Sequence, residues 1–166
     1  VNPWGKAIGD INNDGLIDLV VGGNASKELF WYQAPDWKKY LIATGYQFST
    51  DYLVVDIDRD GLHDVVSLAK EGLFWFKAPN WEEHKITSVT LHDIEAADLD
   101  HDGDIDLVAR NQSAFGDGRT VYIFEHETPN RWRQIELQAP EGEGLALADL
   151  DLDLSLIHIS EPTRPY

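Results

Sequence analysis

Residues 56–64 read DIDRDGLHD, and this stretch decides the fold because it recurs along the chain. The same pattern, D-x-[D/N]-x-D-G-x-x-D, stands at residues 10–18 (DINNDGLID) and 98–106 (DLDHDGDID). A further copy begins at residues 149–153 (DLDLD) and then departs from the pattern. The copies start 46, 42 and 51 residues apart, so the chain is predicted to consist of repeats of about that length.

Four short β-rich stretches accompany each complete copy of the acidic loop. In the second copy these stretches are residues 52–57, 65–68, 73–76 and 84–87, the last after a turn with Pro79 and Trp81. Four strands in a unit of this length predict an all-β chain, a partial β-propeller of four-stranded blades. A β-sandwich is the alternative, but it does not explain why whole four-strand units recur. The blades are expected at about residues 4–46, 47–89 and 90–139, with the start of another at 140–153.

The composition excludes several classes of partner. The chain has 166 residues and a formal net charge of −17, which argues against nucleic acid, because phosphate binding needs clusters of Lys and Arg. No apolar run is long enough for a membrane span. The absence of cysteine excludes disulfides and thiolate zinc sites. With 43% apolar residues, the chain can still bury a core.

The acidic loops place oxygen donors where a loop can wrap a hard cation. Positions 1, 3, 5 and 9 offer side chains, position 6 is a glycine that permits a sharp turn, and position 7 offers its backbone carbonyl. Ca²⁺ takes about six to eight such oxygens. The predicted Ca²⁺ ligands are Asp10, Asn12, Asp14, Leu16 and Asp18; Asp56, Asp58, Asp60, Leu62 and Asp64; and Asp98, Asp100, Asp102, Asp104 and Asp106, with Leu16, Leu62 and Asp104 acting through their carbonyls.

Other ions and other loop types fit less well. An EF-hand needs a glutamate at position 12 and flanking helices, but position 12 is Val21, Ser67 or Ala109 and the flanks read as strands. Mg²⁺ prefers fewer protein oxygens, and Zn²⁺ prefers His or Cys. The alternative that remains is an acidic surface turn without an ion, in which crowded carboxylates would repel each other.

The residues around the loops also carry a family resemblance. Residues 54–66 and 96–108 place the loop between short apolar stretches at blade spacing, and this pattern resembles the FG-GAP/VCBS repeat family. The resemblance implies a calcium-binding β-propeller, often seven-bladed as in integrin α-subunit heads, of which this chain would supply about three and a half blades. It also implies a secreted, cell-surface or periplasmic protein. Residues 29–37 and 73–81 more loosely resemble propellers of sugar lyases and aldos-2-ulose dehydratases.

Two functions follow as hypotheses. The first is a scaffold that presents a carbohydrate-binding or protein-binding surface. The second is the propeller of a carbohydrate-active enzyme with chemistry in a central channel, where His92, Asp93 and Glu95 would stand before the third loop as an acid–base or metal-binding group. The alternative for these three is that they are solvated residues of a polar channel. Tyr52 is a weaker channel candidate.

Several aromatic residues have expected structural roles. Trp31, Trp37, Trp75 and Trp81 stand at equivalent places in two repeats, so they are expected to pack between blades. His84 and His126 flank predicted strands and are expected at the surface.

The last residues of the chain differ from the repeats. Residues 154–166 read LSLIHISEPTRPY, and residues 154–164 match, without a mismatch, the translation of a transposon-type sequencing adapter. This tail is expected to be non-native. The chain begins at Val1 and carries no signal peptide, so the natural protein is expected to extend beyond it.

Overall fold

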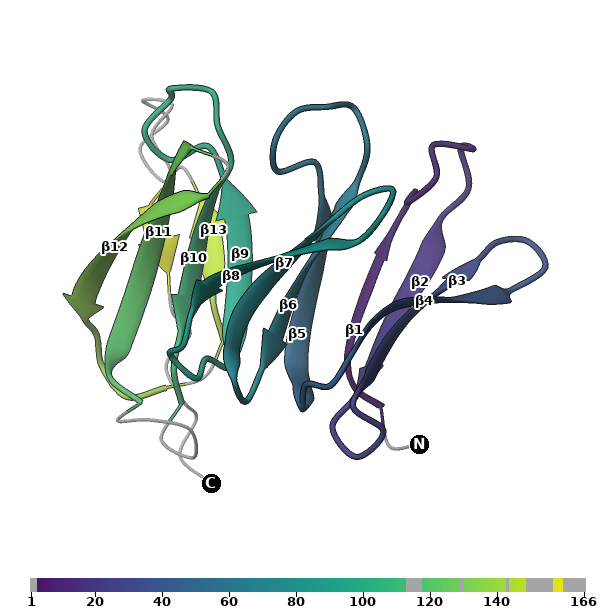
Figure 1. Cartoon of the computed structure of the whole chain (residues 1–166). Coiled ribbons are helices and arrows are strands. Elements are labelled where there is room, and N and C mark those ends of the chain that lie inside the picture. The colour runs from purple at the N-terminus through teal and green to yellow at the C-terminus, as the bar shows by residue number, and fades with distance from the viewer. Residues whose placement is uncertain (1–2, 113–117, 129, 143, 149–156, 160–166) are drawn as a thin grey trace. The chain divides into compact units, whose positions relative to one another are not determined.

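Figure 1 shows the computed structural model, which describes residues 3–112, 118–128, 130–142, 144–148 and 157–159. These residues form strands and turns, and none of them lies in a helix. Accordingly, the described part of the chain has no helix that could span a membrane. The predicted all-β class is confirmed.

Three antiparallel sheets of four strands each make up most of the structure, and in each sheet the strands pair in chain order. We call these sheets blades 1, 2 and 3. Blade 1 contains β1 (Pro3–Gly9), β2 (Asp18–Gly23), β3 (Glu28–Gln33) and β4 (Lys38–Thr44). Blade 2 contains β5 (Phe48–Val55), β6 (Asp64–Ala69), β7 (Gly72–Lys77) and β8 (Glu82–Thr87). Blade 3 contains β9 (Asp93–Ala97), β10 (Asp106–Arg110), β11 (Thr120–Thr128) and β12 (Arg131–Gln138).

The up-and-down order of four strands is the topology of a propeller blade, so the predicted blades are present. A short hairpin follows, in which β13 (Ala146–Ala148) pairs with the backbone of β14 (Ile157–Ile159). The partial fourth loop at residues 149–153 and most of the predicted tail lie outside the described residues.

The chain divides into two compact units, residues 1–90 and residues 91–166. The first unit holds blades 1 and 2, and the second holds blade 3 and the short hairpin. Within the first unit, β1 and β5 lie side by side (Figure 1). An aromatic core joins these two blades and includes Trp31 from blade 1 with Phe48, Phe74 and Phe76 from blade 2.

Burial follows the position of each strand within its blade. The central strands β6 and β7 are buried along almost their whole length, which matches their continuous apolar sequences. The last strand, β8, keeps mostly exposed or half-buried residues. In the second unit, β10 is likewise fully buried, including Arg110, whose guanidinium donates to the carbonyl oxygens of Gly118 (3.2 Å) and Pro140 (3.1 Å).

Glycines in blade 1 make room for a tyrosine of blade 2. The side chain of Tyr52 lies against Gly5 and Gly22, where a Cβ atom on either glycine would collide with its ring or hydroxyl. Tyr52 is 2% exposed. The prediction that it lines a channel is therefore wrong, because its ring belongs to the contact between the two blades.

The predicted packing between blades is confirmed for Trp31 and Trp81, which belong to or pack against the core that joins blades 1 and 2. Trp75 is fully buried and stacks on His84 of its own blade. Trp37 differs, because 56% of its surface is exposed. Trp81 lies in the turn of blade 2 beside blade 1, whereas Trp37 lies in the matching turn of blade 1.

The prediction that His84 and His126 lie at the surface is wrong. His126 is 5% exposed within β11 and stacks on Trp132 at 4.3 Å between ring centroids. His84 is half-buried within β8 and stacks on Trp75 at 4.5 Å. A polar ring in a short strand reads as a surface residue, but its flat face can cover an aromatic neighbour on the adjacent strand.

Candidate metal sites in the acidic loops

Each acidic loop connects the first two strands of its blade. Loop 1 (residues 10–18) links β1 to β2, loop 2 (56–64) links β5 to β6, and loop 3 (98–106) links β9 to β10. The ninth loop residue is in each case the first residue of the second strand. The strand therefore fixes the end of the loop, while the loop backbone forms the bends before it.

The three loops share one backbone conformation. Position 4 has a positive φ in every loop, at 58° for Asn13, 58° for Arg59 and 59° for His101. Position 6 is a glycine in the same left-handed region, with φ between 84° and 98°. A residue with a Cβ is strained there, so glycine at position 6 is required by the turn.

The aspartate at position 9 ties the loop to the rest of its blade. In loop 2, Asp64 Oδ2 accepts the N–H of Ile57 at 3.2 Å, and Oδ1 accepts the N–H of Ala78 at 2.8 Å. The other two loops repeat these backbone hydrogen bonds. Asp18 accepts the N–H groups of residues 11 and 34, and Asp106 accepts those of residues 99 and 126. The sequence predicted a metal ligand at this position, but it did not predict this structural role.

The three aspartates at position 9, which we call the latch aspartates, are deeply buried. Asp18 and Asp64 are fully buried, and Asp106 is 2% exposed. Burial raises the pKa of Asp64 and of Asp106 above the ordinary value, while the backbone N–H groups act in the opposite direction. The ionised carboxylates therefore carry a desolvation cost that the two hydrogen bonds offset only in part.

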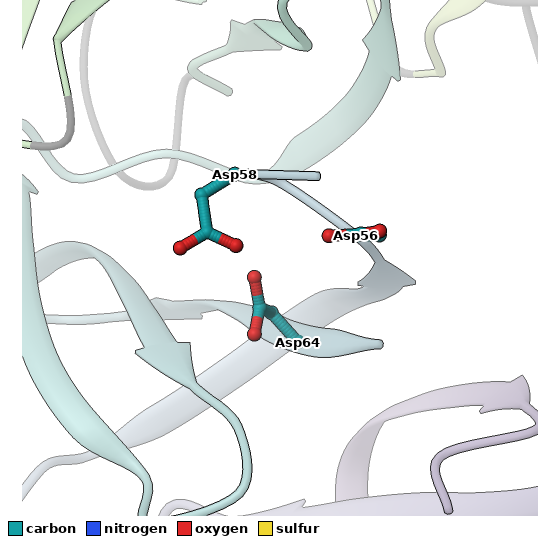
Figure 2. A group of neighbouring side chains, drawn as sticks. All are labelled: Asp56, Asp58 and Asp64. Atoms are coloured by element: carbon teal, nitrogen blue, oxygen red, sulfur yellow. The ribbon is translucent and has the colours of Figure 1, made fainter. Parts of the chain in front are cut away.

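Loops 2 and 3 each gather three carboxylates around one point. In loop 2, ligand atoms of Asp56, Asp58 and Asp64 all lie within 4.8 Å of one another. Figure 2 shows the carboxylates of Asp58 and Asp64 facing each other, with Asp56 beside them. In loop 3 the corresponding group is Asp98, Asp100 and Asp106. The side-chain positions brought together are thus 1, 3 and 9.

Loop 2 leaves carboxylate oxygens without partners at this point. Oδ1 of Asp56 and Oδ1 of Asp58 are buried and accept no hydrogen bond. The second oxygen of Asp56 accepts the N–H of Gly61 at 2.9 Å, so the orientation of this carboxylate is fixed by the turn. Unpaired carboxylate oxygens are costly to bury, and a divalent cation would satisfy them.

Position 5 also has a role within the loop backbone. The Oδ1 atoms of Asp14, Asp60 and Asp102 accept the N–H of position 7, at 2.9, 2.9 and 2.8 Å. These three aspartates are not members of the carboxylate groups found among the described residues. Their other oxygens still border the loops, so their assignment as ligands stays a prediction.

Loop 1 differs from the other two in its side-chain contacts. Asp10 accepts the N–H groups of Asp14 (3.0 Å) and Gly15 (2.8 Å), and Asn12 Nδ2 donates to Asp14 Oδ2 at 2.9 Å. With an amide at position 3, loop 1 satisfies its own oxygens more fully than loop 2. The hydrogen bonds to Asn12 and Leu16 lower the pKa of Asp14.

The predicted catalytic group is only partly assembled. His92 Nδ1 lies 3.1 Å from Asp93 Oδ1. The other oxygen of Asp93 accepts the N–H of Gly144 at 3.2 Å, which gives this aspartate a structural role at the start of β9. Glu95 lies two residues further along the same strand and is half-buried. A role of these residues in catalysis stays a prediction.

Comparison with known proteins agrees with the repeated architecture. No curated protein matches the chain. Residues 10–67 match a family model described as FG-GAP-like repeat. This match runs from the first residue of loop 1 through loop 2 into β6. The match confirms, for this segment, the resemblance suggested by the loops and the blade spacing, and the four-stranded sheets agree with the propeller fold that such repeats form.

Proposed function

We propose that this chain is a calcium-binding repeat module, in which Ca²⁺ in the three acidic loops stabilises the propeller blades. The blades then act as a rigid scaffold that presents a surface to a carbohydrate or protein ligand. In this proposal the ion has a structural role, because the loops join the first two strands of each blade and contact the end of the third strand.

The observation that carries the proposal is the pair of unsatisfied oxygens in loop 2. Asp56 Oδ1 and Asp58 Oδ1 are buried without a hydrogen-bond donor, beside the fully buried Asp64. An isolated surface turn would leave these oxygens in water. Lys77 contacts Asp58 and supplies one positive charge against the three carboxylates, so a bound cation is needed to compensate the remaining buried charge.

The donor set fits a hard cation. Carboxylate oxygens at positions 1, 3 and 9 and the carbonyl at position 7 would hold the ion, and Ca²⁺ accepts such oxygens in flexible geometry. Among the described residues, the three-member acidic groups contain neither His nor Cys, the ligands that Zn²⁺ prefers. When bound, Ca²⁺ would supply the positive charge that offsets the repulsion between the aspartates.

The same chemistry supports a location outside the cytoplasm. Extracellular calcium modules bind with dissociation constants of about 10⁻⁴ to 10⁻³ M, matched to the calcium concentration there. Loops that serve only to stabilise a fold need no higher affinity. We therefore propose an extracellular, cell-surface or periplasmic protein.

We place the proposed ligand-binding surface on the first unit. A groove of about 400 Å³ lies between blades 1 and 2, lined by Trp31, Tyr40, Leu41 and Trp81 among others. Trp31 and Tyr40 stack at 4.7 Å, and Leu41 is 50% exposed. The half-buried rings of Tyr40 and Trp81 offer aromatic surface to this groove and Asn12 offers a polar group, a combination that suits a sugar ring. A change in tryptophan fluorescence on titration with an oligosaccharide would support this, and an unchanged spectrum across an oligosaccharide series would contradict it.

A calcium-dependent melting experiment tests the proposed function. In 10 mM Ca²⁺ the melting temperature should rise by about 5 °C or more over that in chelator, since each of the three sites, at about ten times a dissociation constant of about 10⁻³ M, adds about 1.4 kcal/mol. Millimolar Mg²⁺ should give a smaller rise. The double variant Asp56→Asn/Asp58→Asn should reduce the calcium-dependent shift, whereas Asp36→Asn, in an exposed turn outside the loops, should retain it. An equal melting temperature in Ca²⁺ and chelator would contradict the proposal.

The enzyme hypothesis depends on the His92–Asp93 contact. A carboxylate that orients a histidine is a common element of acid–base sites. Asp93 also holds the backbone at Gly144, so Asp93→Asn should lower the melting temperature. His92→Ala lacks that structural effect. Loss of turnover in His92→Ala with unchanged melting would favour the enzyme.

A further inference from the structure

The residue at the end of the third strand differs among the three blades. Gln33 ends β3 and Lys77 ends β7, while Glu125 occupies the matching place in β11. Their equivalence follows from the latch aspartates, because Asp18, Asp64 and Asp106 each accept the N–H of the next residue. The register agrees, since Leu19, Val65 and Leu107 pair with the residue just before each of them. One position beside the loop therefore carries a neutral, a positive or a negative side chain.

Lys77 reaches directly into the carboxylates of loop 2. Its Nζ contacts Asp58 Oδ2 and lies 2.9 Å from Asp60 Oδ2. These are the residues at positions 3 and 5 of the loop. Lys77 is only 29% exposed, and Asp58 is 13% exposed, so water screens this contact less than it would screen a surface ion pair.

The other two loops have no such ammonium at that position. In blade 1, Gln33 Nε2 lies 3.5 Å from Asp14 Oδ2, which is position 5 of loop 1. Gln33 thus points the same way as Lys77 but brings no charge. In blade 3, Glu125 forms an ion pair with Arg133, whose Nε lies 2.5 Å away. Here the residue beside the loop is an additional carboxylate.

We propose that Lys77 is a built-in counter-cation of loop 2, which makes this loop the weakest of the three calcium sites and the one least dependent on calcium for its structure. This inference rests on the proposed function. An ammonium that bridges positions 3 and 5 neutralises part of the charge that would attract Ca²⁺. A bound ion must share Asp58 with Lys77 or displace it, and the two cations repel each other.

The alternative is a plain structural ion pair. Lys77 could stabilise the end of β7 through Asp58 and Asp60 without any effect on an ion held by Asp56, Asp58 and Asp64. Its removal would then lower stability equally with and without calcium. The two cases differ in the sign of the change in calcium affinity, which makes them distinguishable.

A loop-resolved titration tests the proposal. The glycine at position 6 provides one backbone amide signal per loop, from Gly15, Gly61 and Gly103. Amide NMR of the 166-residue chain during a Ca²⁺ titration should show the Gly61 signal reaching its midpoint at a higher Ca²⁺ concentration than the other two. Lys77→Gln, which installs the residue of blade 1, should lower the Gly61 midpoint about tenfold, equivalent to about 1.4 kcal/mol.

The reciprocal substitution supplies the matched test. Gln33→Lys should raise the Gly15 midpoint by a similar factor and leave Gly61 unchanged. Lys70→Gln removes a positive charge from the exposed turn at the other end of β6, so it should move none of the midpoints. In chelator, Lys77→Gln should melt at a lower temperature than the wild type, and millimolar Ca²⁺ should restore most of the loss.

The outcomes separate this inference from the proposed function. If no glycine signal responds to Ca²⁺, the proposed function fails. If the wild type binds Ca²⁺ but Lys77→Gln leaves the Gly61 midpoint unchanged or raises it, calcium binding stands and the counter-cation role of Lys77 is overturned.

Discussion

The imidazole Nδ1 of His63 lies 2.6 Å from the backbone carbonyl oxygen of Asp10, so loop 2 contacts the first residue of loop 1. A second contact runs the other way, because Asn13 Nδ2 donates to the carbonyl of Gly61 at 2.6 Å. The two loops of the first unit are therefore joined directly, and this contact lies outside the aromatic core that also joins blades 1 and 2. An ion in either loop would stabilise the contact between these two blades as well as its own blade.

The His63 contact gives the first prediction. His63→Ala should lower the free energy of unfolding by about 1 kcal/mol, because it removes one hydrogen bond between the loops. Ile17 occupies the same loop position in blade 1 and is 57% exposed, so Ile17→Ala should change stability by less than about 0.5 kcal/mol. Denaturant unfolding measures both variants, and equal losses would show that the His63 contact contributes nothing specific.

A second prediction concerns the latch aspartate Asp64. Asp64→Ala leaves the buried N–H groups of Ile57 and Ala78 without acceptors, so it should destabilise the chain by about 3 kcal/mol even in chelator. Asp64→Asn retains one acceptor oxygen and should lose less. Calorimetry in chelator separates this structural role from metal binding. Wild-type stability of Asp64→Ala in chelator would mean that Asp64 acts only through an ion.

The latch also shows what the sequence could and could not predict. The spacing of the loops and the aromatic runs predicted the four-stranded blades, because every blade must bury the same faces. The acidic pattern predicted five ligand positions in each loop, and in loops 2 and 3 the structure brings together the carboxylates of positions 1, 3 and 9. The backbone partners of Asp64 were not predictable, since Ala78 is 14 residues away and carries no side-chain signal. The contact of Lys77 with loop 2 was not predictable either, because it arises only when β7 pairs with β6.

A third prediction tests the contact between blades 1 and 2. Gly22→Ala should destabilise the chain by about 1–3 kcal/mol, because the added methyl would collide with the side chain of Tyr52. In a Tyr52→Ala background the same substitution should cost much less, because the opposing ring is gone. Unfolding of the two single variants and the double variant gives the coupling energy. Strictly additive losses would contradict the proposed packing.

A fourth prediction concerns alkaline pH. Tyr46 donates its hydroxyl to Glu83 at 2.6 Å, and this hydrogen bond to a carboxylate, the largest cause, raises the pKa of Tyr46 to about 12. Because this pKa lies above the ordinary value of 10.0, the stabilisation is complete below pH 10 and is lost as the pH rises from 10 through 12.

The matching variant is Tyr46→Phe, which keeps the ring against Phe74 but has no group that titrates. Its stability should fall less steeply between pH 10 and pH 12 than that of the wild type. Denaturant unfolding at pH 9 and at pH 11.5 measures the difference. Parallel pH profiles for the two proteins would show that Tyr46 does not contribute to the alkaline loss.

The central claim is that the three acidic loops bind calcium, and a direct count of bound ions tests it. Equilibrium dialysis of the chain against millimolar Ca²⁺, followed by elemental analysis, should give close to three ions per chain. The count should fall to about two in the Asp56→Asn/Asp58→Asn variant. A value near zero for the wild type at millimolar Ca²⁺ would contradict the account.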